Sequence, residues 1–100
     1  MNMQKIMQQA QQMQAKAQQV QGELELKEVE ATAGGGVIKV VATGGKKIKS
    51  IKISPEAVDE DDVQMLEDLV LTAVNDALNK ADELSNAEMA KVTGGMGNLF

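Results

Sequence analysis

A narrow apolar seam near the start of this chain constrains its fold more than any other feature. Apolar residues recur there at alternating steps of three and four, which keeps one stripe on one side of a helix expected at about residues 3–24. The stripe consists of Met3, Ile6, Ala10, Met13, Ala17, Val20 and Leu24. Most positions between them are glutamine, a good helix former without charge. Because a lone amphipathic helix gains most of its stability from packing, this seam requires a partner in the same chain or in a second copy.

The next part of the chain has the composition of three short strands joined by glycine turns. Alternating and β-branched residues predict strands at residues 25–33, 37–43 and 46–53, separated by Gly34–Gly36 and by Gly44–Gly45. The glycine pair suits the positive φ angles of a two-residue hairpin turn. Ile48 has opposite parity to Ile51 and Ile53, which predicts either a bulge or burial on both faces of the last strand. The pattern indicates a three-stranded antiparallel meander.

A second, longer helix is expected after the strands. Pro55 suits the first position of a short helical turn, and Asp59 is the expected N-cap of a helix spanning about residues 59–92. The apolar face of this helix is broader than the first seam and is expected to cover the sheet: Leu66, Leu69, Val70, Ala73, Val74, Ala77, Leu78, Ala81 and Leu84. The glycine-rich residues 93–100 are expected to form a flexible tail.

These elements predict an α+β fold in a single domain of residues 1–100. The order is an N-terminal helix, a three-stranded antiparallel meander and a long C-terminal helix. The expected core combines the sheet and the long helix and consists of Ile38, Val40, Ile51, Ile53, Leu66, Val70 and Val74.

Composition argues against an enzyme. The chain has no cysteine and no histidine, and its carboxylates show no catalytic spacing. Neither glycine cluster fits a phosphate-binding motif, since Lys47 follows Gly45-Lys46 where a P-loop requires serine or threonine. The acidic run 59–62 is no EF-hand loop, because Val63 and Gln64 occupy a ligand position and the glycine position. We therefore expect no cofactor, no metal and no small-molecule substrate. Without a signal peptide or a membrane-spanning run, a cytoplasmic location is expected.

The lysines are the candidate functional residues. Net charge is −5, but residues 1–22 and 34–53 contain lysines and no acid. With no arginine and a single aromatic residue, Phe100, nucleic-acid binding is expected to rely on phosphate contacts. The candidates for DNA binding are Lys5, Lys16, Lys46, Lys47, Lys49, Lys52, Lys80 and Lys91. The competing interpretation is that these lysines only solubilise a sheet edge and two helix faces.

The whole chain resembles one family, the YbaB/EbfC family of bacterial nucleoid-associated proteins. The resemblance is carried by MQKIMQQA (3–10), EVEATAGGGVIKV (28–40), IKSIKI (48–53), MLEDLV (65–70), AVNDAL (73–78) and KVTGGMG (91–97). It implies a homodimer of small α+β protomers, shaped like tweezers. It further implies binding to double-stranded DNA, a change in DNA conformation, and a role in nucleoid organisation and gene expression. The family offers no catalytic motif.

A protein-interaction module is the alternative function. The seam of the first helix uses methionine and alanine, which favour an adaptable contact. In this interpretation the first helix docks a partner helix.

Overall fold

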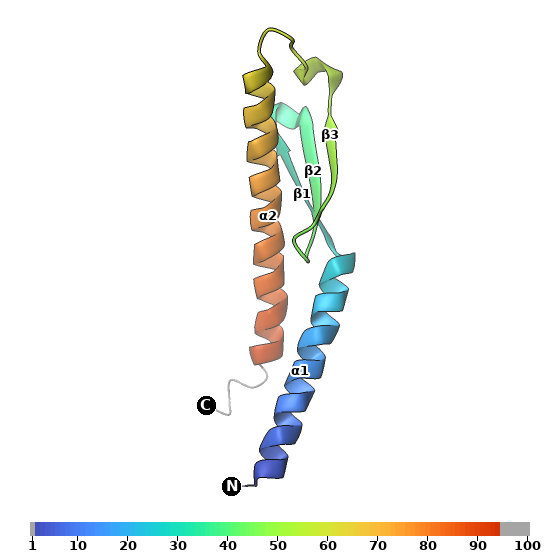
Figure 1. Ribbon diagram of the computed structural model, residues 1–100, viewed down its shortest axis with the longest axis vertical. Coiled ribbons are helices and arrows are strands. Elements are labelled where there is room, and N and C mark those ends of the chain that lie inside the picture. Colours follow the sequence, from blue (N-terminus) through green and yellow to red (C-terminus); the bar gives the residue numbers. More distant parts are fainter. Residues whose placement is uncertain (1, 95–100) are drawn as a thin grey trace.

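The helices and strands of the structure follow the order that the sequence periodicities predict. The computed structural model describes residues 2–94. It contains α1 (Met3–Leu26), β1 (Glu28–Ala33), β2 (Ile38–Thr43), β3 (Ile48–Ile53) and α2 (Val63–Gly94). Single 3-10 turns at Gly34–Gly36 and Pro55–Ala57 lie between β1 and β2 and between β3 and α2. The predicted α+β class is therefore confirmed. The molecule is elongated, 70 × 21 × 16 Å, with both helices along its length (Figure 1).

The three strands form one antiparallel sheet in the order β1-β2-β3, as the meander predicts. Val41 pairs with Ser50 and Ala42 pairs with Ile48, so that Lys49 is an extra residue on β3. This β-bulge accounts for the mixed parity of the isoleucines in β3.

The core lies between one face of the sheet and α2, which packs over β1 and β2 (Figure 1). Ala73, Ala77 and Ala81 recur at four-residue steps on α2 and are completely buried. Their small side chains let the helix lie close to the sheet, where Ile38 and Val40 are also completely buried. Three further predicted core residues are half-buried and pack against this cluster: Leu66, Val70 and Val74.

Two residues predicted to lie in the core are exposed. Ile53 pairs with Ile38 and Ile51 pairs with Val40, so both isoleucines share the face of the sheet that α2 covers. They remain 42% and 44% exposed because α2 lies over β1 and β2 and leaves β3 uncovered. The prediction of their burial was wrong, since strand periodicity gives the face of a residue but not the lateral position of the covering helix.

Several element boundaries differ from those predicted. The helix α1 continues through Leu26, so that only Lys27 separates it from β1. Asp59 is not the cap of α2, because the backbone N–H of Met65 donates to Oδ1 of Asp62 at 3.2 Å. Asp59 instead accepts from the backbone N–H of Asp61 at 2.9 Å, within the turn before the helix.

The C-terminal boundary is also later than predicted. The helix α2 reaches Gly94, so the first two residues of the expected tail are helical. The remainder of that expected tail, residues 95–100, lies outside the described residues.

The turn between β2 and β3 is not a two-residue glycine turn. The backbone N–H of Lys46 donates to the carbonyl of Thr43 at 2.9 Å, and Lys46, rather than either glycine, has a positive φ of 67°. Gly44 is needed for space: a Cβ there would lie 2.8 Å from both Cδ2 and the backbone oxygen of Leu24. Glycine thus allows the hairpin to contact the end of α1.

Candidate nucleic-acid interface

The helix α1 is packed at one end and projects at the other. Leu24, near its C-terminal end, is 2% exposed, whereas Met3 at the other end is 71% exposed. Between them, Met13, Ala17 and Val20 are half-buried. The N-terminal part of α1 extends past the last described turn of α2 (Figure 1). We call residues 2–13 the arm.

Local contacts fix the direction in which the arm projects. Near the C-terminal end of α1, Leu24 packs against the hairpin at Gly44. Lys27, the one residue between α1 and β1, donates from Nζ to a carboxylate oxygen of Glu88 on α2 at 2.9 Å. This hydrogen bond, with further attraction from Lys27 and Lys91, holds the pKa of Glu88 below its ordinary value. No local sequence pattern predicts the Lys27–Glu88 pair, because the two residues lie 61 positions apart.

Two predicted lysines lie on α1, and one of them is on the arm. Lys5 and Lys16 are both exposed, and their separation of about three helical turns places them on one side of α1. Neither forms an ion pair within residues 2–94. Lys16 and Lys91 line a hollow of about 260 Å³ where α1 meets α2. The fold therefore brings these two candidates together, although Glu88 lines the same hollow.

On the sheet, by contrast, Lys39 and Lys49 are paired with acids from β1. Lys49 pairs with Glu28, and Nζ of Lys39 lies 3.0 Å from a carboxylate oxygen of Glu30. Lysines and acids that lie in separate segments of the sequence are thus close neighbours in the folded sheet. Pairing of the first predicted strand with the second was the signal that could have revealed this, since it sets these glutamates beside β2.

Three more predicted lysines are engaged in contacts with other elements. Nζ of Lys46 lies 2.7 Å from Asp82 on α2, and Nζ of Lys91 lies 3.7 Å from Glu88. Lys80 donates to the backbone oxygen of Glu30 on the edge strand β1 at 2.8 Å. The three lysine side chains are exposed, so the ion pairs of Lys46 and Lys91 contribute little stability.

Lys47 and Lys52 are exposed and make no ion pair in the part of the chain that the structure describes. Lys52 pairs across the strands with Lys39, which places two cations side by side on the face of the sheet that α2 does not cover. Lys47 and Lys52, together with the two lysines of α1, are the candidates best placed to meet an anionic ligand.

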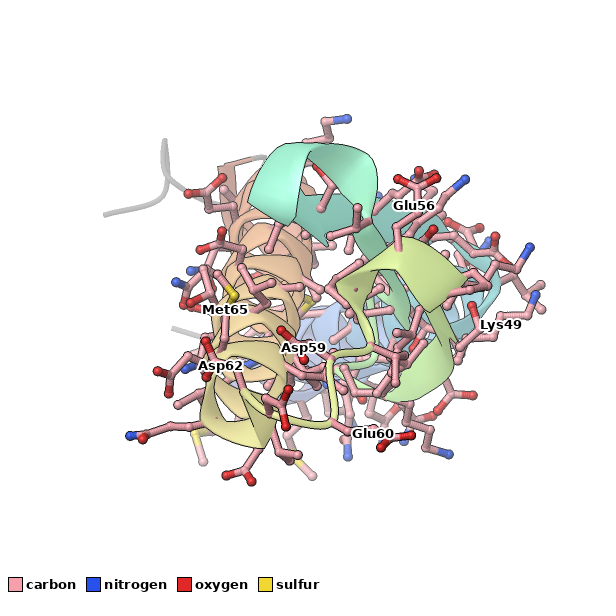
Figure 2. All side chains as sticks on the ribbon, turned by 90° about the horizontal axis from the view of Figure 1, so that it is seen from above. Lys49, Glu56, Asp59, Glu60, Asp62 and Met65 are labelled. Carbon is pink, nitrogen blue, oxygen red and sulfur yellow. The ribbon has the colours of Figure 1, made fainter. Side chains whose placement is uncertain are left out.

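Opposite ends of the molecule differ in charge. Residues 54–79 contain eight acids and no lysine: Glu56, Asp59, Glu60, Asp61, Asp62, Glu67, Asp68 and Asp76. Several of them gather where the chain passes from β3 to α2, at the end of the molecule far from the arm (Figure 2). Residues 2–22 contain Lys5 and Lys16 and no acid. The electrostatic potential is therefore more positive around the arm than at the far end.

In the part of the chain that the structure describes, neither α1 nor α2 has the length and apolarity of a membrane-spanning helix. What the fold and the charge pattern define is a small α+β protein that carries an acid-free helical arm.

Comparison with known proteins identifies its family. The model of the YbaB/EbfC DNA-binding family matches residues 1–96. A nucleoid-associated protein of Ruminiclostridium cellulolyticum is 58% identical over 98 residues, covering 98% of this chain and 85% of that protein. One from Acetivibrio thermocellus is 57% identical, covering 98% and 87%. The chain belongs to the YbaB/EbfC DNA-binding family, as the resemblance indicated.

The fold is also found in a solved structure. A crystal structure of an uncharacterized protein from Helicobacter pylori superimposes with a TM-score of 0.78. The match covers 87% of this chain and 91% of that one at 16% sequence identity, so this similarity bears on the fold alone.

Proposed function

We propose that this chain binds double-stranded DNA as a homodimer, mainly through phosphate contacts, and alters the conformation of the duplex. Its role would lie in nucleoid organisation and gene expression, and its location in the cytoplasm at the nucleoid. Membership of a DNA-binding family supports the choice of ligand. The observation that carries the mechanism is the arm, which projects from the body with lysine as its only charged side chain.

Duplication of the chain is part of the proposal because one copy offers few unpaired cations. Phosphate contacts contribute to affinity through counterion release, so doubling their number steepens the dependence of binding on salt. Lysine without arginine favours contacts that position the protein over contacts that read bases. We therefore expect weak sequence preference, set by the shape and flexibility of the duplex.

A second copy has a suitable place beside β3. A groove of about 450 Å³ between β3 and α2 is lined by Ile53, Leu66, Glu67, Val70, Leu71 and Val74. Ile51 and Ile48 are also exposed on β3, which is an edge strand. The other edge strand, β1, has a backbone oxygen covered by Lys80. An uncovered apolar groove next to an open sheet edge is the surface that association would bury. The arm lies toward the other end of the molecule and stays accessible (Figure 1).

The alternative, a module that docks a partner helix along the seam, has less support. From Met13 to Leu24 the seam is already half-buried or buried beside α2 and the hairpin. What remains is shorter than the three or so heptads that typify helix pairing.

Duplex binding measured against salt, beside the mass in solution, tests the proposal. We expect a dimer whose log affinity falls steeply and linearly with log salt concentration. A flat dependence contradicts the phosphate mechanism, and a monomer at working concentrations contradicts the dimer.

A further inference from the structure

The outermost turn of the arm is more apolar than a solvated helix end requires. Met3, Ile6 and Met7 are 71%, 45% and 58% exposed. Spacings of three and four residues place these side chains on one face of a single helical turn. The turn is capped, since the backbone N–H of Gln4 donates to Oδ1 of Asn2 at 3.1 Å. An ordered helix thus presents a small apolar cluster, which we call the tip, at the end of the molecule.

Neither a partner helix nor a second copy fits the tip well. Helix pairing along a seam needs about three heptads, and this seam is half-buried from Met13 inward. The uncovered apolar groove beside β3 is also distant from the tip, toward the other end of the molecule (Figure 1).

The charges around the tip specify the kind of surface that it meets. Lys5 lies in the same helical turn, is exposed and makes no ion pair in the described structure. Gln4 and Gln8 add amide groups that can donate hydrogen bonds without adding charge. A cluster of acids, Glu56, Asp59, Glu60 and Asp62, lies instead at the opposite end (Figure 2). A cation, neutral donors and flexible apolar side chains together complement a surface that is anionic outside and apolar inside.

We propose that the tip enters the minor groove of duplex DNA, where Met3 and Met7 wedge between adjacent base pairs while Lys5 contacts the neighbouring phosphates. The inference rests on the proposed function and supplies the means by which the duplex changes conformation. Apolar wedges between base steps unstack them and kink the duplex. Methionine suits this role because its unbranched, polarizable side chain adapts to an irregular gap. Flexible pyrimidine–purine steps are the preferred sites, because they unstack at least cost.

The test compares the full chain with the M3A/M7A double variant. Alanine keeps the helix, which circular dichroism verifies, and removes the wedge. The matched control is Met65→Ala, which truncates a methionine of similar exposure, 57%, at the acidic end of the molecule. Two measurements are made on a short duplex: energy transfer between dyes at its ends, which reports bending, and fluorescence of 2-aminopurine at a TA step, which reports unstacking.

We expect the wild-type chain and the control to bend and unstack the duplex, and the double variant to lose both signals. The double variant should still bind with an unchanged slope of log affinity against log salt, because Lys5 and Lys16 remain. Equal bending and unstacking by the double variant overturns the wedge and leaves phosphate binding intact. If the double variant loses the mass of the dimer, the tip is a protein contact and the wedge proposal is overturned. If the wild-type chain binds anionic vesicles but does not bend DNA, and the double variant fails to bind the vesicles, the tip is a membrane contact and the wedge proposal is likewise overturned. Absence of duplex binding by wild type overturns the proposed function itself.

Discussion

Nζ of Lys27 lies 2.9 Å from a carboxylate oxygen of Glu88, and this contact ties the junction between α1 and β1 to the middle of the C-terminal half of α2. The side chain of Glu88 is 18% exposed, and it also lies 3.7 Å from Nζ of Lys91. Of these two cations only Lys27 joins separate elements, so its contact holds the C-terminal end of α1 against α2.

Stability should therefore fall at acid pH in a manner that depends on Glu88. The hydrogen bond from Lys27 lowers the pKa of this carboxyl from 4.5, so the folded chain binds its proton less readily than the unfolded chain. Its contribution is complete above pH 4.5 and is lost as the pH falls through the lowered pKa. Glu88→Gln should reduce the urea midpoint at pH 7 and make little difference at strongly acid pH. Glu83→Gln is the control, and an equal loss at both pH values contradicts the assignment.

Gly44→Ala should destabilise the fold and displace the C-terminal end of α1. The added Cβ would lie 2.8 Å from the backbone oxygen of Leu24, which cannot move without moving α1. Overpacking of this kind costs about 1–3 kcal/mol, measurable by urea unfolding. Gly22→Ala is the matched control, because nothing lies within 4 Å of its added Cβ and alanine favours the helix by about 0.8–1 kcal/mol. Effects of the same sign at both positions contradict the close-approach argument.

Replacing Lys5 and Lys16 with glutamine should weaken duplex binding and flatten its salt dependence. Each lost phosphate contact reduces the slope of log affinity against log salt by about 0.9. The control replaces Lys39 and Lys49, which are already paired with Glu30 and Glu28. If replacing Lys39 and Lys49 weakens duplex binding more than replacing Lys5 and Lys16, the DNA interface lies on the sheet and not on α1.

Leu71→Asp should convert the dimer to a monomer, as sedimentation would measure. Leu71 is 59% exposed and lines the groove beside β3, where a carboxylate would be buried without a partner on association. Met65→Asp is the control, because Met65 has nearly the same exposure, 57%, and does not line that groove. A dimer of unchanged strength in Leu71→Asp excludes the groove as the interface.

The parts of the fold set by local periodicity could be predicted from the sequence. The seam beginning at Met3 and the β-branched run beginning at Ile38 each define an element by the spacing of its own residues. The features that could not be predicted depend on where α2 lies across the width of the sheet. Ile51 and Ile53 have the periodicity of core residues, yet they are exposed because α2 lies over β1 and β2 and does not cover β3.

The candidate site shows the same limit. Exposure of Lys5 follows from a helix whose seam faces elsewhere, and the sequence pattern predicts it. The ion pair of Lys46 with Asp82 depends on how the hairpin meets α2, over a separation that no local pattern spans. Cations that lie alone in the sequence can thus be neutralised by tertiary contacts.

The acidic turn before α2 has a consequence for how the molecule approaches a duplex. With like charge at that end and lysine at the other, the chain behaves as an electric dipole, and the field of a polyanion exerts a torque on it before any contact forms. Encounters should therefore occur arm first, and added salt should slow association by erasing this alignment as well as by weakening the bound state.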